Sequence, residues 1–191
     1  MKSCETIICA VGTGLDQEMA PDLGGISEIV KTLSDNLSTG ALLILKTTLP
    51  VGTTELISEK LSEATGFSLG SELFVAFCPE RIVEGKAMEE LRSLPKIVGG
   101  IDEKSSDKAA RVMSLLGGRV IQVSDSRTAE MCKLLDNAYR ITRFGFAADV
   151  AGVSSRCGVD PYEAIRAANL DYERNSIPLP SVGASGYCLT K

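Results

Sequence analysis

Short apolar runs alternate with amphipathic stretches along the first two thirds of the chain, and this alternation limits the possible folds more than any other feature. The strand-like runs are Thr6–Val11, Ala41–Leu45, Leu73–Phe77, Lys96–Gly99 and Arg119–Val123. Apolar residues at helical spacing occur in Gly25–Leu37, Thr53–Ala64 and Ser105–Leu116. Strands that alternate with helices in this way predict βαβ units, and so an α/β fold with a parallel sheet and right-handed crossovers.

The pattern changes after Val123. The segment Ser126–Arg156 contains no proline and only two glycines. As one helix it would be about 46 Å long at about 1.5 Å per residue, which is too long for a crossover in a small sheet. It predicts a helix that joins domains or pairs subunits, followed by a short helix over Pro161–Ala168. We place the domain boundary near Val123.

Charge and residue usage exclude several classes of function. The 191 residues carry a net charge of −5 without a basic run, which argues against a nucleic-acid partner. The chain has no histidine, so histidine-based triads, HExxH zinc sites and histidine proton shuttles are excluded. None of the six cysteines forms a CxxC pair, and no apolar run is long enough to cross a bilayer. We therefore expect a cytoplasmic protein with reduced thiols, no metal and no membrane association.

Polar residues follow each of the first three predicted strands, at the edge where open α/β sheets bind ligands. Gly12-Thr13-Gly14 follows the first strand and either admits a phosphate or ribose or merely turns the chain. Thr47 and Thr48 follow the second strand, and Thr53 or Thr54 is expected to cap the next helix.

Two further sets of polar residues allow two interpretations each. Glu80 and Glu84, four residues apart after the third strand, could act as a base or orient a water, but their residue types alone favour a solvated cluster with Arg81. A polar stripe on the long helix consists of Glu130, Lys133, Asn137 and Arg140. Helical spacing favours a solvated face with a Glu–Lys pair; the alternative is that Lys133 and Asn137 hold an oxyanion.

Cys188 differs from the other cysteines because it lies in a glycine-bearing loop. A thiolate nucleophile requires polar or cationic surroundings, and without histidine Lys133 is a plausible source of positive charge. Four other cysteines lie in or beside apolar segments and are expected to be small buried hydrophobes: Cys4, Cys9, Cys132 and Cys157.

Taken together, these segments resemble the UDP-glucose/GDP-mannose dehydrogenase family of nucleotide-sugar 6-dehydrogenases. The resemblance spans the chain and rests on KTTLPVGTT (Lys46–Thr54), FCPERIVEG (Phe77–Gly85), KIVGG (Lys96–Gly100), SRTAEMCKLLDN (Ser126–Asn137) and GASGYCLTK (Gly183–Lys191), in the family's order. The second and last segments are most similar to the branch that acts on N-acetylhexosamine nucleotides, such as UDP-N-acetyl-D-mannosamine.

The resemblance implies a fold and a reaction. Residues 1–123 would form the second half of a Rossmann-type NAD-binding domain, and residues 124–191 part of an all-α central domain that forms a homodimer through the long helix. The family oxidises the C6 alcohol of a nucleotide sugar, here most plausibly a UDP-sugar, to the uronic acid with two NAD, in polysaccharide precursor biosynthesis. The reaction passes through a cysteine thiohemiacetal and a thioester.

The resemblance also implies roles for individual residues. The catalytic residues would be Cys188, Lys133, Asn137, Glu80 and Thr48. The NAD contacts would be Val11, Gly12, Thr13, Thr47, Thr48 and Glu84. The substrate contacts would be Glu80, Arg81, Lys133, Asn137, Ser181, Gly183 and Ser185.

Parts of the family pattern have no counterpart in the chain: the first Rossmann half, with its GxGxxG motif, and the C-terminal domain. We therefore expect an incomplete portion of the enzyme that is inactive in isolation. Two alternatives remain open. The chain could be a truncated or split product that only folds and dimerises, or it could be a β-hydroxyacid-type dehydrogenase that does not use the cysteine.

Overall fold

The computed structural model describes residues 4–11, 24–83 and 85–181. The chain divides into two compact units, Met1–Leu134 and Leu135–Lys191. The helix α5 (Ser126–Cys157) begins in the first unit and ends in the second.

The first unit is built on a five-stranded sheet with the strand order β1-β2-β3-β4-β5. The strands are β1 (Thr6–Cys9), β2 (Ala41–Leu45), β3 (Leu73–Phe77), β4 (Lys96–Gly100) and β5 (Val120–Gln122). The predicted α/β class is confirmed. The first three strands are parallel, and β4 and β5 are parallel to each other, but β4 runs antiparallel to β3. The prediction of a wholly parallel sheet is therefore wrong at this one pair.

The connection between β3 and β4 differs from the crossovers that lead into β2 and β3. A parallel crossover must carry the chain back along a strand, and α1 (Gly24–Ser34) and α2 (Thr53–Thr65) do this with about 16 and 20 Å of helix. The described part of the connection after β3 contains α3 (Ala87–Ser93), which is about 10 Å long and has no buried residue. The next strand, β4, enters the sheet from the carboxyl end of β3 and runs antiparallel to it.

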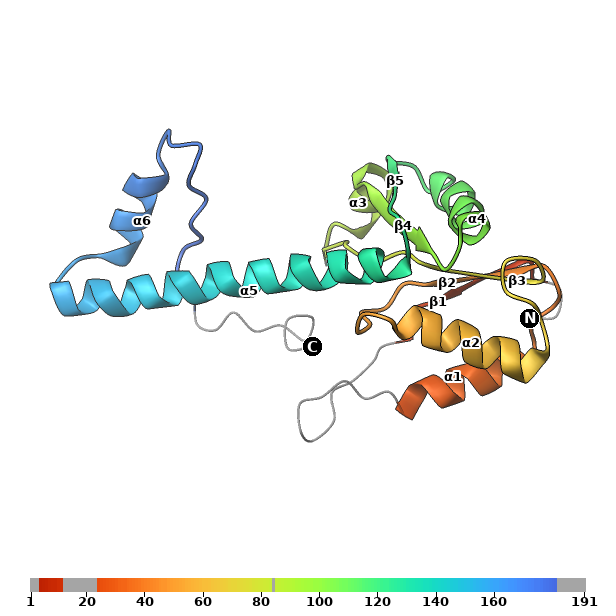
Figure 1. Cartoon of the computed structure of the whole chain (residues 1–191). Helices are drawn as coiled ribbons and strands as arrows, with labels where there is room; N and C mark the ends of the chain where they lie inside the picture. Colours follow the sequence, from red (N-terminus) through yellow and green to blue (C-terminus); the bar gives the residue numbers. More distant parts are fainter. Residues whose placement is uncertain (1–3, 12–23, 84, 182–191) are drawn as a thin grey trace. The chain divides into compact units, whose positions relative to one another are not determined.

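Helices cover both faces of the sheet (Figure 1). On one face α1 and α2 pack on alternate strand residues, with Ile26, Ile57 and Leu61 against Leu43 and the same face of its neighbours. On the other face α4 (Glu103–Ser114) packs on the remaining strand residues, with Ala109 and Met113 as its buried contacts. Strands covered on both faces are apolar at every position, which explains why β2 and β3 were predicted with their observed bounds.

The second unit comprises the rest of α5 and the helix α6 (Pro161–Asn169). Asp160 caps α6 by accepting a hydrogen bond from the Tyr162 amide at 2.8 Å, and Pro161 occupies the first turn, where its missing N–H costs nothing. The chain after α6 is tied to it by Asn169, whose side chain donates to the Ile177 carbonyl and accepts from the Ile177 amide.

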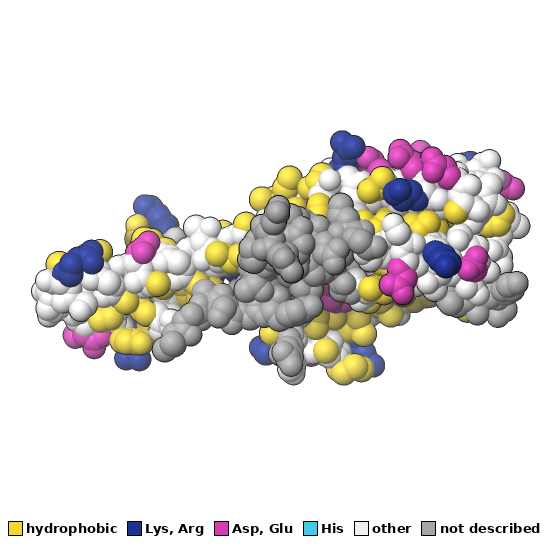
Figure 2. All heavy atoms as spheres, turned by 90° about the horizontal axis from the view of Figure 1, so that it is seen from below, with side chains coloured by type: hydrophobic (Ala, Val, Ile, Leu, Met, Phe, Trp, Pro, Cys, Tyr) yellow, Lys and Arg dark blue, Asp and Glu magenta, His cyan; other side chains and the backbone are white. Residues whose placement is uncertain are grey.

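The described surface carries charges of both signs. On the face drawn in Figure 2, basic and acidic side chains are interspersed among hydrophobic ones, and its described side chains form no continuous basic field. Within the described ranges, no helix is both long and apolar enough to cross a membrane. The same residues contain no group of three or more histidine, cysteine, aspartate or glutamate side chains that could hold a metal ion.

Candidate functional site

The carboxyl ends of β2 and β3 bring a lysine and a glutamate together. Lys46 directly follows β2 and Glu80 follows β3 by three residues. The Lys46 Nζ lies 3.1 Å from the Glu80 Oε2, and the backbones join through the Glu80 amide, which donates to the Lys46 carbonyl at 3.2 Å. The parallel pairing of the two strands thus places one charged pair at the ligand-binding edge.

The helix α5 contributes a second lysine to the same place. The Lys133 Nζ donates a 2.6 Å hydrogen bond to the Glu80 carbonyl oxygen. Two ammonium groups, Lys46 and Lys133, therefore contact Glu80 from different elements. Such an arrangement stabilises negative charge at the edge of the sheet.

The Glu80 carboxyl is held in its ionised form. Its partial burial alone would raise the pKa, but the Ile82 amide, the Lys46 ammonium and the Arg81 amide outweigh burial, so the pKa lies below its ordinary value. The Oε1 accepts the Arg81 and Ile82 amides at 2.8 and 2.9 Å, while the side chain remains 42% exposed. A carboxylate with fixed orientation and solvent access is suited to positioning a water or accepting a proton.

Cys78, which directly follows β3 and lies two residues before Glu80 in the chain, is not a suitable nucleophile. Cys78 is fully buried at the end of β3, and burial raises the pKa of its thiol despite the opposing effect of Lys46. A thiol of this kind is inert because the thiolate is the reactive form. Among the other described cysteines, Cys9 is buried as predicted, whereas Cys4 and Cys157 are exposed and Cys132 is partly exposed. The prediction of small buried hydrophobes is therefore wrong for Cys4 and Cys157, whereas Cys132 is partly buried and packs against the core.

The polar stripe on α5 is not the solvated face that helical spacing favours. Glu130 has no exposed surface and Asn137 is 3% exposed, while Lys133 and Arg140 are partly buried. Glu130 bonds the Gly52 and Thr54 amides instead of pairing with Lys133. Asn137, in the second unit, accepts a hydrogen bond from Arg140 at 2.6 Å. The predicted Glu–Lys pair is thus replaced by contacts to distant segments or to the next turn.

The helix cap predicted in the β2–α2 connection also differs. Gly52, at φ 92°, is the N-cap of α2, and no side chain caps this helix from within its own segment. The Thr54 hydroxyl donates to Glu130 Oε1 at 2.6 Å instead. A carboxylate from α5 therefore performs the capping expected of Thr53 or Thr54.

The remaining predicted site residues fall into two groups. Those that the structure describes lie at strand ends or in the second unit: Val11 is exposed after β1, Thr47 and Thr48 are partly buried after β2, Arg81 is partly buried beside Glu80, and Ser181 is exposed. Those that lie outside the described residues are Gly12, Thr13, Glu84, Gly183, Ser185 and Cys188.

Sequence reasoning missed two residues of this region as individual site residues, Lys46 and Glu130. Lys46 could have been found, since it is the first charged residue after a wholly apolar strand, where a side chain reaches the ligand edge. Glu130 lies on a helix turn rich in apolar residues. Its hydrogen-bond partners are 76 and 78 residues away in the chain, so they could not be predicted from the spacing of nearby residues.

Comparison with known protein families gives two matches that together cover most of the chain. The NAD-binding domain of the UDP-glucose/GDP-mannose dehydrogenase family matches residues 1–116, and the central domain of the same family matches residues 127–191. The chain belongs to this family. The resemblance and the NAD cofactor predicted from the sequence are thereby confirmed.

Relatives in this family are identical to the chain at about a third of the aligned positions. UDP-N-acetyl-D-mannosamine dehydrogenase of Pyrococcus horikoshii is 34% identical over 100% of this chain and 45% of its own length. NDP-N-acetyl-D-galactosaminuronic acid dehydrogenase of Ralstonia solanacearum is 37% identical over 97% of this chain and 45% of its own length. The chain thus spans less than half the length of these relatives.

Solved structures agree with the sequence matches. The UDP-D-ManNAc dehydrogenase structure from Pyrococcus horikoshii superposes with a TM-score of 0.94 at 34% identity, covering 98% of this chain and 44% of that chain. A 3-hydroxyisobutyrate dehydrogenase from Mycobacterium tuberculosis superposes with a TM-score of 0.67 at 14% identity, covering 92% of this chain and 53% of that chain. This second likeness shows the fold alone.

The described residues at the sheet edge fit the family's cofactor chemically. NAD presents hydroxyl and phosphate groups together with flat rings. The end of β2 offers the Thr47 and Thr48 hydroxyls, and the end of β1 offers the exposed Val11. All three residues follow parallel strands of a doubly wound sheet, the position at which such sheets bind dinucleotides.

Proposed function

We propose that this chain is part of an NAD-dependent nucleotide-sugar 6-dehydrogenase that oxidises the C6 alcohol of a UDP-N-acetylhexosamine to the uronic acid, a precursor for polysaccharides. Its relatives from Pyrococcus and Ralstonia bear names of this kind. The observation that carries the proposal is the meeting of Lys46, Glu80 and Lys133 at the carboxyl edge of the sheet. These residues supply one carboxylate side chain and two cationic side chains for a reaction that converts a sugar alcohol into an acid.

We assign the chain's residues complementary roles in this reaction. NAD, when bound beside Val11, Gly12, Thr13, Thr47, Thr48 and Glu84, supplies the hydride acceptor for both oxidation steps. The Cys188 thiolate would add to the aldehyde carbon and hold it as a thiohemiacetal, then as a thioester. Lys133 and Asn137 would stabilise the oxyanion in each addition.

The last step is hydrolysis of the thioester. Glu80 is ionised and partly exposed, so it can orient a water molecule and accept its proton. Thr48 would place the same water. The Arg81, Ser181, Gly183 and Ser185 segments would contact the sugar nucleotide.

The runner-up functions are less well supported. A β-hydroxyacid-type dehydrogenase shares the fold, as the Mycobacterium neighbour does, but at 14% identity. A fragment that only folds and dimerises remains the alternative for this chain in isolation, because it spans 45% of the length of its relatives.

The experiment that tests the proposal measures NADH release from the polypeptide in which this chain occurs. UDP-N-acetylmannosamine, UDP-N-acetylgalactosamine, UDP-glucose, GDP-mannose and 3-hydroxyisobutyrate are compared as substrates. We expect two NADH per molecule of a UDP-N-acetylhexosamine and a uronic acid product by mass spectrometry. One NADH per substrate, or turnover of the hydroxyacid alone, would reject the proposal.

We also propose that the second unit forms a homodimer through α5. Tyr139, Phe146 and Val153 are seven residues apart and are 64%, 52% and 50% exposed. Side chains at this spacing lie along one stripe of a helix, the pattern by which two helices pair.

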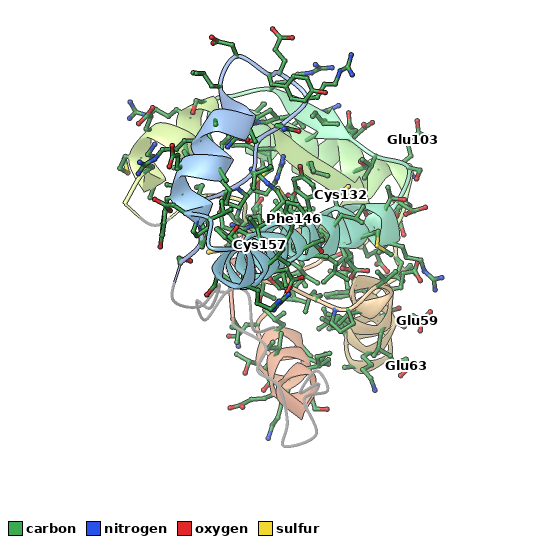
Figure 3. All side chains as sticks on the ribbon, turned by 90° about the vertical axis from the view of Figure 1, so that its left-hand side faces the viewer. Glu59, Glu63, Glu103, Cys132, Phe146 and Cys157 are labelled. Carbon is green, nitrogen blue, oxygen red and sulfur yellow. The ribbon has the colours of Figure 1, made fainter. Side chains whose placement is uncertain are left out.

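Replacing Phe146 by lysine is expected to convert this dimer into a monomer, because it places a charge in the apolar stripe. Light scattering measures the change in mass. Glu103→Lys introduces the same residue at an exposed position of α4 and should leave the dimer intact; Figure 3 labels both positions. A wild-type chain that is monomeric would refute the dimer directly.

A further inference from the structure

The buried carboxylate of Glu130 has no role in the proposed chemistry, yet it makes three short hydrogen bonds to a distant segment. Its Oε2 accepts the Gly52 amide at 2.6 Å, and its Oε1 accepts the Thr54 amide at 2.7 Å and the Thr54 hydroxyl at 2.6 Å. Glu130 has no exposed surface. A fully buried carboxylate is costly unless its oxygens are satisfied, and here three donors satisfy them.

The segment that Glu130 holds is the connection from β2 to α2. This connection carries Thr47 and Thr48, and its end, Gly52 to Thr54, forms the first turn of α2. Free amides at a helix N-terminus form a partial positive charge that a carboxylate stabilises. Glu130 therefore fixes both the end of the connection and the start of the helix.

The helix that bears Glu130 also bears Lys133. The two residues are three positions apart, so they lie on neighbouring turns of α5, and Lys133 donates a hydrogen bond to the Glu80 carbonyl. Ala129 is buried in the core under α1 and α2, which fixes this end of α5 within the first unit. One short stretch of helix therefore touches the connections that follow β2 and β3.

We infer that Glu130 is a positioning residue. It fixes the β2–α2 connection, which carries Thr47 and Thr48, in its position relative to Lys133 and Glu80. This inference rests on the proposed function, because the proposed oxidation of the sugar nucleotide is the reaction in which these residues act together. The exposed Arg127–Glu55 pair, at 2.7 Å, joins the same two helices at the surface. Exposed ion pairs contribute little, so the buried carboxylate carries the coupling.

The decisive variant is Glu130→Gln. The glutamine amide would point an N–H at the Gly52 or the Thr54 amide, and at least one hydrogen bond would be lost. Glu59→Gln makes the same chemical change at an exposed position of α2 and is the matched control; the side chain of Glu59 points outward from the helix in Figure 3. Thr54→Val, which removes only the hydroxyl donor, serves as a milder variant if Glu130→Gln does not fold.

Two measurements separate positioning from general stability. The first is amide hydrogen exchange, which we expect to rise about tenfold or more in residues 46–54 of Glu130→Gln while β3 and α4 keep their protection. The second is NADH formation by the polypeptide in which this chain occurs. We expect kcat to fall about 10- to 100-fold with KM for the sugar nucleotide changed less than threefold or so. Thr54→Val should give smaller changes of both kinds.

Two outcomes would overturn the inference, and a third would reject the proposed function without overturning the inference. Exchange that rises equally throughout the first unit would show a merely structural role and overturn it. Exchange and kcat that both match those of Glu59→Gln would overturn it as well. A wild-type polypeptide without NADH formation would reject the proposed function. A rise in amide exchange confined to residues 46–54 of Glu130→Gln would still support the inference that Glu130 fixes the β2–α2 connection.

Discussion

Replacing Gly99 by alanine is expected to destabilise the first unit by about 3 kcal/mol, the upper part of the range for overpacked cores. A Cβ at this position would lie 2.1 Å from the Asp125 carbonyl oxygen and 2.7 Å from its carbon. Both atoms belong to the backbone at the start of α5, so no rotamer change relieves the clash. Gly100 faces a similar limit at the start of α4, with Ser106 N at 2.3 Å.

Urea unfolding followed by circular dichroism measures this effect. At about 1–3 kcal/mol per molar urea, the midpoint should fall by roughly 1–3 M. Gly25→Ala is the matched control, since nothing lies within 4 Å of a Cβ there and alanine favours helix. An unchanged midpoint for Gly99→Ala would contradict the close approach of β4 and α5.

Continuous apolar runs were enough to predict the strands β2 and β3 of the sheet. Leu43 and Phe77 have no exposed surface, and their strands are buried on both faces, so a continuous apolar run marks each one. For the two glycines of KIVGG, the sequence predicts only a strand and a family motif. Their packing role depends on backbone segments that follow them in the chain, and no local pattern records such a contact.

Two features of the sheet's second half leave no apolar pattern in the sequence. The helix α3 has no buried residue, so it shows no apolar stripe to predict it. The strand β4 runs antiparallel to β3, and periodicity says nothing about strand direction. Sequence reasoning therefore failed where an element buries no side chain and where the direction of a strand had to be known.

The site could be predicted only where it follows strand ends. Glu80, Thr47 and Thr48 were found because parallel strands deliver their following residues to one edge. Glu130 was assigned to a solvated face because its helical neighbours are polar at the same spacing. Its true partners, Gly52 and Thr54, are known only once α5 is packed on α2.

Replacing Cys188 by serine is expected to abolish formation of the uronic acid, with a loss of about 10⁴-fold or more, as for other covalent nucleophiles. A serine hydroxyl is a far weaker nucleophile than a thiolate and forms no thioester. The described cysteines offer no substitute near Glu80, because Cys78 is fully buried and its thiol pKa is raised by burial. The first oxidation, to the aldehyde, does not need the thiol.

The variant must therefore be assayed for both products. Mass spectrometry of the sugar nucleotide separates aldehyde from acid, and acid quenching of the wild type should trap a thioester on the peptide that contains Cys188. Cys157→Ser, at an exposed position at the end of α5, is the matched control and should retain full acid formation. Undiminished acid formation by Cys188→Ser would exclude the thioester route and favour chemistry of the β-hydroxyacid type, in which Lys133 and Asn137 act without a cysteine.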